Sequence, residues 1–365
     1  MIPTVVTNIL FLLKYKIYEP AVAYPFRSAH VTRTDHAFSF AENLRNFAIF
    51  LMMRTFLTES PEEAAGFVRR GGIVAFPTET VYGLGADVFD ERAVAAIFEA
   101  KMRPADNPLI AHIADFGQIG ELASETTPSA RSFIDSFFPG PLTIVLHKSD
   151  RVPLIATAGL DTIGIRMPGF ELSRRFLKEC GTPVVAPSAN LSGRPSPTTW
   201  QAVFEDLDGR IDCILKGDAT EIGLESTVVD CTGEFPVVLR SGSITTNELR
   251  LVVPATIVAD GSDADAPRSP GMKHRHYSPL ANVVIVSAAA EALPDQRAAF
   301  IGLDKPQNGF ASVRICHTVD EYAREIFEFL RECDRKGFGT VYCQSVTDDG
   351  IGTALMDRLR RASQG

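Results

Sequence analysis

The sequence predicts a mixed α/β protein that has one large sheet and, after it, a smaller Rossmann-like α/β unit. Short apolar runs rich in Val and Ile recur along the first two thirds of the 365-residue chain, and segments with helical spacing lie between several of them. This pattern stops in a stretch rich in Pro, Gly, Ser and Asp around 254–280, after which strand and helix signals resume. The length is sufficient for two domains, each with its own core.

The first unit is predicted to begin with a helix after Ser60. Ser60 and Glu63 have the spacing of a capping box, and Gly71 is expected to end the helix. Later helices are expected to begin after Asp90 and Thr127, which are good N-caps. The apolar runs between and after these helices predict strands at 73–77, 109–113, 142–147, 162–168, 183–187, 226–230 and 236–240.

The second unit is predicted to alternate strands and helices. The segments "NVVIVS", "SVRIC" and "GTVYC" have the composition of buried strands, and "IGTALMDRLRRAS" has helical spacing. The longest helix, "VDEYAREIFEFLREC", has its apolar residues on one face. Because the unit lacks a G-x-G-x-x-G motif, we do not expect a dinucleotide there.

Residues 1–57 differ from the rest of the chain. Charged residues interrupt their apolar runs, and no small-residue cleavage pattern follows a clean apolar core. Nowhere does the sequence have the ~18 uninterrupted apolar residues of a membrane span. We expect an amino-terminal extension outside the fold over 1–57, a large domain over 58–254, a linker over 255–280 and a small Rossmann-like domain over 281–365.

Charge is unevenly distributed along the chain. The formal net charge of −9 argues against broad binding to a polyanion. The linker nevertheless has four consecutive basic or imidazole side chains at 273–276, and no Asp or Glu lies near them. This local cationic segment predicts an anionic partner, which could be nucleic acid, a membrane surface or a small phosphorylated ligand.

The six cysteines show no C-x-x-C spacing, and a chain of this size does not need disulfides for stability. We expect free, mostly buried thiols in a reducing cytoplasm.

Three segments next to predicted strands place polar side chains two residues apart. In an extended segment such pairs share a face, and Pro104 disfavours the helical conformation for the residue before it. Loops at strand ends are where α/β proteins bind ligands. Without a Walker A motif, a phosphate would be held by side-chain cations and hydroxyls. The pairs are Thr78 and Thr80, Lys101 and Arg103, and Ser188 and Asn190.

Each of these features also has a purely structural interpretation. Lys101 and Arg103 could be solvated cations at a helix C-terminus. Ser188 and Asn190 could serve turn geometry. His112, inside the apolar run "LIAHI", would by default be a hydrogen-bonded core histidine.

The combination of motifs is far more specific than any one of them. With these motifs in this order, the chain closely resembles the two-domain threonylcarbamoyl-adenylate synthases, which are built on the YrdC-like domain. The resemblance covers about 58–365 and implies a YrdC-like twisted mixed sheet with helices for the large domain. The motifs are "GGIVAFPTETVYGLGAD", "KMRPADNPL", "GIRMP", "APSANLSGRPSPT", "GLESTVVD", "LRSG" and "SPGMKHRHYSP".

The resemblance implies a nucleotidyltransferase of tRNA modification. Members of this family combine L-threonine, bicarbonate or CO2, and ATP into threonylcarbamoyl-AMP and release pyrophosphate. A separate transferase then moves the group to tRNA to give threonylcarbamoyladenosine. The resemblance also implies Mg²⁺ bound with ATP and a basic linker lying over the nucleotide pocket.

The resemblance also implies roles for individual residues. Arg166 would bind the threonine carboxylate, and Lys101 and Arg103 would stabilise charge during the reaction. No side chain stands out as a general base, and no metal ligand is assigned. L-threonine would lie among Thr80, His112, Arg166, Ala186 and Ser226, and ATP among Lys101, Arg103, Asn107, Thr162, Ser188, Asn190, Ser196, Arg240 and Tyr277.

Two other functions stay open. YrdC-like domains resemble double-stranded RNA binders, so the protein could be an RNA-binding module without turnover, although the net charge of −9 counts against it. Weak RNA binding could also accompany synthase activity. Carbamoyl transfer in hydrogenase maturation involves a related domain, but it usually comes with zinc-finger segments that need paired C-x-x-C motifs.

Overall fold

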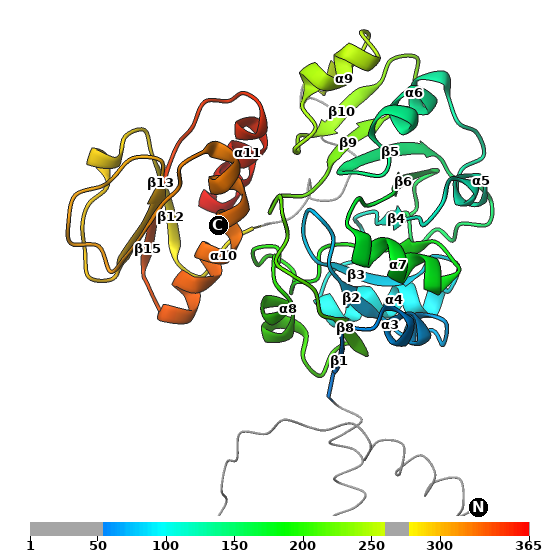
Figure 1. Ribbon diagram of the computed structural model, residues 1–365, viewed down its shortest axis with the longest axis horizontal. Coiled ribbons are helices and arrows are strands. Elements are labelled where there is room, and N and C mark those ends of the chain that lie inside the picture. Colours follow the sequence, from blue (N-terminus) through cyan, green and yellow to red (C-terminus); the bar gives the residue numbers. More distant parts are fainter. Residues whose placement is uncertain (1–53, 260–276, 365) are drawn as a thin grey trace, which may run out of the picture. The chain divides into compact units, whose positions relative to one another are not determined.

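The computed structural model describes residues 54–259 and 277–364 (Figure 1). The predicted extension up to residue 53 and the basic cluster at 273–276 lie outside the described residues.

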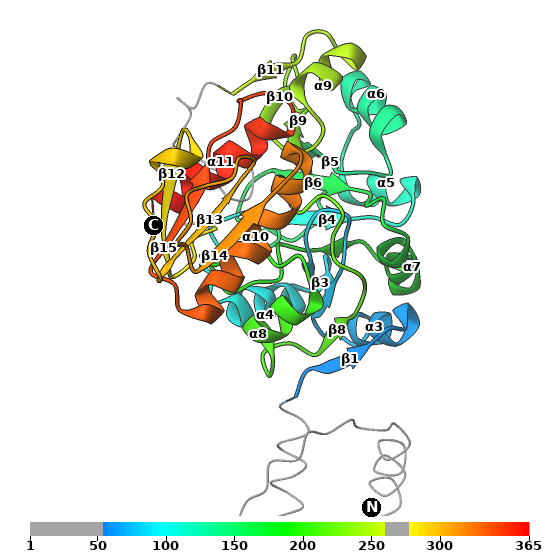
Figure 2. The ribbon, with the colours of Figure 1, turned by 60° about the vertical axis from the view of Figure 1, so that its left-hand side comes forward.

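A twisted mixed sheet forms the large domain. Within the described residues it has eleven strands in the order β1-β8-β2-β3-β7-β4-β6-β5-β9-β10-β11, and Figure 2 shows β1 and β11 at opposite ends. Each strand range predicted for this domain contains an observed strand. The strands are β1 (Phe56–Thr58), β2 (Val74–Phe76), β3 (Gly83–Asp87), β4 (Ile110–His112), β5 (Leu142–His147), β6 (Thr162–Arg166), β7 (Val184–Val185), β8 (Cys213–Leu215), β9 (Thr227–Asp230), β10 (Val237–Arg240) and β11 (Ile257–Val258).

Helices cover both faces of this sheet. On one face α3 and α7 pack together over Phe76, whose ring lies 4.9 Å from that of Phe176. The alternate strand residues point to the opposite face, where α4, α6 and α8 bury residues such as Ile97 and Phe133 in a larger core. The helices are α3 (Pro61–Val68), α4 (Glu91–Lys101), α5 (Ile119–Leu122), α6 (Pro128–Phe137), α7 (Glu171–Cys180), α8 (Trp200–Leu207) and α9 (Thr246–Val252), with a short 3-10 helix at Phe116–Gln118.

The predicted N-caps are confirmed, with one difference in detail. The side chains of Ser60, Asp90 and Thr127 each accept a hydrogen bond from the first turn of the following helix. The capping box at Ser60 is only half formed, because the Glu63 carboxylate accepts a hydrogen bond from the Thr58 hydroxyl at 2.6 Å instead. Helix α3 ends at Val68, and Gly71 lies in the turn beyond it with a φ of +80°.

Strand β3 was not predicted, because the sequence "GLGAD" has two glycines and reads as a loop. It pairs antiparallel with both β2 and β7. Gly85 has no room for a side chain: an added Cβ would lie 2.6 Å from Val184 and 2.9 Å from the Phe76 ring. The glycine is therefore required by close packing on the α7 face of the sheet.

The large domain begins before residue 58. Strand β1 pairs in parallel with β8, and the buried Thr55 hydroxyl donates to the Ile211 carbonyl at 3.0 Å and accepts from the Gly209 amide at 2.9 Å. The sheet therefore includes Phe56 and Leu57, which the sequence had placed in the extension.

The small domain is a parallel sheet with helices, as expected of a Rossmann-like unit. Its described strands lie in the order β12-β15-β13-β14, all parallel, and Figure 1 shows α10 and α11 on one face. Strand β13 was not predicted. The elements are β12 (Asn282–Val286), β13 (Ala298–Gly302), β14 (Ser312–Ile315), α10 (Val319–Lys336), β15 (Thr340–Gln344) and α11 (Ile351–Ser363), with a 3-10 turn at Ala289–Glu291.

The prediction of free, mostly buried thiols is confirmed, because all six cysteines are free and buried. Burial raises the pKa of each thiol; for Cys180 it reaches about 12, so these groups are unreactive thiols at neutral pH. No helix within the described residues is long and apolar enough to cross a membrane.

Candidate functional site

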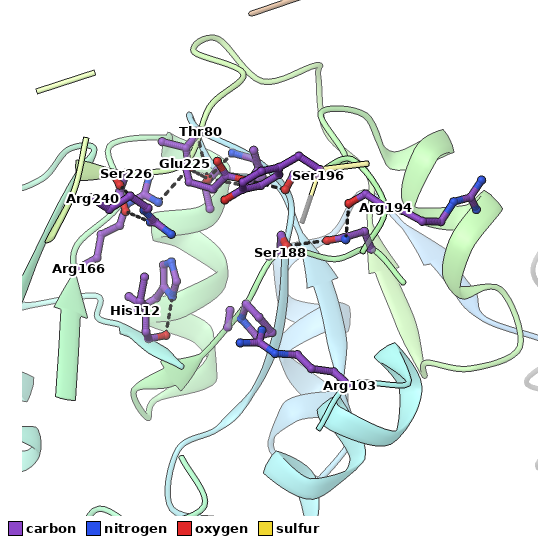
Figure 3. Close-up of a pocket in the computed structure, with 18 residues that line it drawn as sticks. Thr80, Arg103, His112, Arg166, Ser188, Arg194, Ser196, Glu225, Ser226 and Arg240 are labelled. Carbon is purple, nitrogen blue, oxygen red and sulfur yellow. Dashed lines mark hydrogen bonds between the residues drawn. The ribbon is translucent and has the colours of Figure 1, made fainter. Parts of the chain in front are cut away.

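A pocket in the large domain gathers most of the predicted site residues (Figure 3). His112, Arg166 and Arg240 are the last residues of β4, β6 and β10, so the ends of these strands deliver their side chains to one place. The predicted residues that line the pocket are Thr80, Arg103, His112, Arg166, Ala186, Ser188, Asn190, Ser196, Ser226, Arg240 and Tyr277.

Arg166 is buried and held in one orientation by its neighbours. Its Nη1 donates to Thr80 Oγ1 at 2.8 Å, and its Nη2 lies 2.7 Å from Glu79 Oε1. Burial by itself would raise the pKa of Glu79, but the charge of Arg166 together with hydrogen bonds from Arg166 and the Gly169 amide outweighs it and holds that pKa below its ordinary value. A guanidinium carries five N–H groups, so one fixed in this way can still present a pair to a carboxylate.

His112 is a buried histidine that also lines the pocket. Its Nδ1 lies 3.1 Å from the Ile110 carbonyl oxygen, and because a carbonyl can only accept, Nδ1 carries the proton. Burial and the nearby Arg166 lower the pKa of His112 to about 3. The imidazole is therefore neutral at physiological pH and can act as a hydrogen-bonding group without adding charge.

Ser226 and Arg240 form a second polar cluster on the pocket wall. Ser226 Oγ lies 2.8 Å from Thr143 Oγ1, and Arg240 Nη2 donates to Ser226 Oγ at 3.1 Å. Arg240 Nε also donates to the Ser226 carbonyl at 3.0 Å. These bonds fix the serine hydroxyl and place the Arg240 guanidinium beside it.

Two of the predicted polar pairs do share a face. The hydroxyls of Thr78 and Thr80 lie 2.8 Å apart, and Ser188 Oγ donates to Asn190 Oδ1 at 2.5 Å. In each pair the extended segment directs both side chains to the pocket, as the spacing predicted.

The two side chains of the third pair, Lys101 and Arg103, do not share a face. Lys101 is the last residue of α4, and its buried Nζ donates to the Asn190 carbonyl at 2.7 Å and to the Ser188 carbonyl. Met102 then adopts a left-handed conformation, with φ of 51°, and Arg103 lines the pocket. Burial lowers the pKa of Arg103 to about 10, so it stays charged at neutral pH, whereas Lys101 supports the backbone behind the pocket.

Two other predicted residues lie outside the lining of this pocket. Asn107 is fully buried, and both polar atoms of its side-chain amide make no hydrogen bond to any described residue. Thr162 lines a smaller cavity together with Leu109, Thr143 and Gly164. A buried amide without a partner is costly, so Asn107 is suited to a ligand that would satisfy it.

The sequence interpretation missed two charged residues of the pocket. Arg194 and Glu225 both line it, and Glu225 Oε1 accepts a hydrogen bond from Ser196 Oγ at 2.6 Å (Figure 3). Both lie within motifs that carry the resemblance, "APSANLSGRPSPT" and "GLESTVVD", and this was the available signal.

Fold and pocket together define an α/β ligand-binding protein whose site combines arginines, hydroxyls and one neutral histidine around space for an anionic ligand. A family model described as Telomere recombination matches residues 66–242, and one described as Threonylcarbamoyl-AMP synthase, C-terminal domain, matches residues 244–364. The chain belongs to the threonylcarbamoyl-AMP synthase family in its two-domain form.

The chain matches individual members of this family over nearly the whole length of each member. Threonylcarbamoyl-AMP synthase of Pyrococcus abyssi is 44% identical over 318 residues, which cover 82% of this chain and 93% of the relative. That of Bacillus subtilis is 39% identical over 327 residues, covering 84% and 94%. The solved structure of P. abyssi Sua5 complexed with L-threonine has 40% identity and a TM-score of 0.78, and the match covers 85% of this chain and 97% of that one.

Proposed function

We infer that the protein is a nucleotidyltransferase that makes threonylcarbamoyl-AMP and pyrophosphate from L-threonine, bicarbonate or CO2, and ATP, for threonylcarbamoyladenosine modification of tRNA. Family membership supports this activity, since relatives from P. abyssi and B. subtilis carry that name. The observation that carries it in the structure is the pocket itself, in which Arg166, Arg103 and Arg240 surround one space. An amino acid carboxylate and a triphosphate together require such a set of fixed cations.

The threonine subsite would lie at the ends of β4 and β6. Arg166 would hold the carboxylate, because Thr80 and Glu79 already fix its plane. His112, Ala186 and Ser226 would complete this subsite, and all three line the pocket. The L-threonine complex of the P. abyssi protein supports an amino acid site in this fold.

The ATP subsite would lie beside the threonine subsite in the same pocket. Arg103, Arg240 and the hydroxyls of Ser188 and Ser196 line this pocket, and Tyr277 enters it from the end of the linker. Burial raises the pKa of Tyr277 to about 12, so its phenol is neutral beside the nucleotide. Asn190 would join them from the pocket wall, and Lys101 would act through the Ser188 and Asn190 carbonyls. Asn107 and Thr162 would contact the nucleotide from the neighbouring buried region.

The chemistry needs positioning and charge stabilisation. The threonine amine adds to CO2 and loses a proton, which gives a carbamate. A carbamate oxygen then attacks the α-phosphorus of ATP, a new P–O bond forms, and the bond to pyrophosphate breaks. Negative charge accumulates on the phosphate oxygens, and Arg103 and Arg240 are placed in the same pocket to offset it.

Magnesium would arrive on the phosphates of ATP. Within the described residues no group of three or more His, Cys, Asp or Glu side chains could hold a metal ion, and the pocket's one carboxylate, Glu225, is already bonded to Ser196. These residues could not surround a metal ion with protein ligands alone. They suit a cation whose ligands would be mainly water and the phosphates of ATP. When bound, the ion would neutralise phosphate charge.

The domain organisation that we propose has a catalytic domain over 58–254 joined to the observed β1, a linker over 255–280 lying over the site, and a small domain over 281–365. We further propose a cytoplasmic enzyme, with no membrane partner, that passes its product to a separate tRNA threonylcarbamoyl transferase and binds RNA only weakly. Buried, converging side chains in the pocket favour small ligands over a nucleic acid duplex.

The test is a pyrophosphate-release assay with purified protein. Release should require ATP, L-threonine and bicarbonate together, and omission of any one should abolish it. Release that continues without L-threonine would contradict the proposed function. Salt-sensitive RNA binding without turnover would favour the RNA-binding alternative.

A further inference from the structure

An arginine of the small domain is buried behind the pocket of the large domain. Arg358 lies on α11, and its side chain is 1% exposed. Its Nε lies 3.1 Å from Glu225 Oε2, and its Nη1 donates to the Ser241 carbonyl at 2.8 Å. Its guanidinium carbon also lies 5.8 Å from the centre of the Tyr277 ring. Arg358 therefore contacts two pocket-lining residues, Glu225 and Tyr277.

Glu225 is an acid in a pocket suited to anions. Burial by itself would raise its pKa, but the charges of Arg358 and Arg240, together with hydrogen bonds such as that from Ser196, outweigh this and hold the pKa below its ordinary value. Glu225 is therefore ionised at neutral pH. A carboxylate would repel a polyphosphate in the same low-dielectric space unless a cation behind it compensates.

The charged groups around Glu225 come from two elements. Arg240 at the end of β10 belongs to the pocket wall, where it is bonded to Ser226. Arg358 approaches from α11, and its neighbour Asp357 lies 3.1 Å from Arg358 Nη1. Arg240 faces the pocket and already bonds Ser226. Arg358 is therefore the cation that can compensate the charge of Glu225 without also binding the ligand.

The backbone next to Glu225 is held against the small domain as well. Gly223 has a φ of +81°, and an added Cβ there would lie 2.4 Å from the Cα of Arg324 on α10. Only a glycine allows this close approach. Tyr277 in turn stacks on Phe327 of α10, with ring centres 5.3 Å apart. The small domain thus supports the wall at both residues that Arg358 contacts.

We propose that Arg358 is a positioning residue for ATP. Its guanidinium neutralises Glu225 and holds Glu225 and Tyr277 in the geometry that accepts the polyphosphate. This inference rests on the proposed function, because ATP is the anion concerned. Arg358 itself does not line the pocket, so its effect on ATP passes through these two residues.

The experiment is a double-mutant cycle with Arg358→Met, Glu225→Gln and the double variant, in the full chain. We expect Arg358→Met to raise the KM for ATP at least about tenfold, with a smaller effect on the KM for threonine, because an uncompensated carboxylate remains beside the phosphates. The double variant removes both charges. Its KM for ATP should therefore return to within about threefold of the parent value, which a general packing defect would not allow.

The control is Arg360→Met. Arg360 lies on the same helix, but its side chain is 53% exposed and pairs with Asp348 at the surface. It should have parental kinetics. If Arg358→Met does not fold, Arg358→Lys keeps the charge without the planar fork and should give an intermediate KM.

Equilibrium binding of ATP, measured by calorimetry, separates this inference from the proposed function. Absence of threonine-dependent turnover in the parent would count against the function, while ATP affinities across the cycle would still test Arg358. A parental ATP affinity in both Arg358 variants, or a double variant no better than Arg358→Met alone, would overturn the inference.

Discussion

Arg331 on α10 and Asp206 on α8 form a bidentate ion pair that is almost completely buried. Arg331 Nη2 lies 2.8 Å from Asp206 Oδ2 and Nη1 lies 3.2 Å from Oδ1, and the two side chains are 2% and 0% exposed. Asp206 also accepts hydrogen bonds from Arg194 and from the Leu191 amide. One carboxylate therefore joins the small domain to the loop that follows β7 and carries part of the pocket.

Replacing Arg331 should be much more damaging than replacing a nearby arginine at the surface. Arg331→Met leaves the buried Asp206 without one of its cations, and we expect a loss of about 3–5 kcal/mol. Arg335 also joins α10 to α8, through Glu205 at 3.3 Å, but both side chains are about 40% exposed. Arg335→Met should cost about 0–1 kcal/mol. Thermal unfolding of both variants checks this, and equal losses would contradict it.

Substitutions of Arg103 and Lys101 should affect activity and stability differently. Arg103→Ala removes a charge that lines the pocket, so adenylate formation should fall at least ~100-fold while the melting temperature stays near the parent's. Lys101→Met removes the anchor of the Ser188 and Asn190 carbonyls, so both activity and melting temperature should fall. Pyrophosphate release and thermal unfolding, measured together, distinguish the two roles.

His112 should make the folded state sensitive to mild acid. Its pKa is about 3 in the folded protein against an ordinary value of 6.5, so between these values the unfolded chain binds a proton that the folded protein does not. Stability should therefore fall as pH decreases through this window, by about 1.4 kcal/mol per pH unit from this residue. Urea unfolding at pH 7 and pH 5 should show a larger loss for the parent than for His112→Gln. Equal losses would mean that the folded pKa is not depressed.

Amino acid selectivity should depend on the hydroxyl more than on the methyl group. Serine keeps the hydroxyl and loses only a methyl contact, worth roughly 1 kcal/mol. Valine cannot make the hydrogen bonds that the threonine hydroxyl would make to Thr80, His112 or Ser226, and it should be rejected more strongly, by ~100-fold or more. Pyrophosphate release with each amino acid is the measurement. If valine and serine are turned over equally well, the side chain of the amino acid substrate does not contact these polar groups.

The amino-terminal boundary can be tested with two shortened chains. One that starts at Met53 keeps Thr55 and its bonds to Gly209 and Ile211, so it should fold and react like the full chain. One that starts at Glu59 loses β1 from the sheet, and its melting temperature should fall by about 2–4 °C or more. If both melt like the parent, β1 contributes nothing to stability.

The sequence predicted most of the pocket because its motifs place polar side chains directly after buried strands. Thr80 and Ser188 follow from extended spacing next to strands and Arg166 from the family resemblance, and all three line the pocket. Local patterns could not reveal Lys101's true role, since the left-handed Met102 separates it from Arg103. They also could not reveal Glu225 with Arg358, because 133 residues separate these partners in the chain. Such pairs arise only when two domains pack.

The two buried pairs also constrain how such a chain could become shorter. A protein that ended near residue 254 would keep Asp206 and Glu225 but lose Arg331 and Arg358, so two interior acids would each give up a cation at once. Deletion of the second domain would therefore change the charge balance at both acids, which would keep Arg194 and Arg240 as their remaining cations. A descendant that had lost this domain is therefore expected to show compensating substitutions at positions 206 and 225.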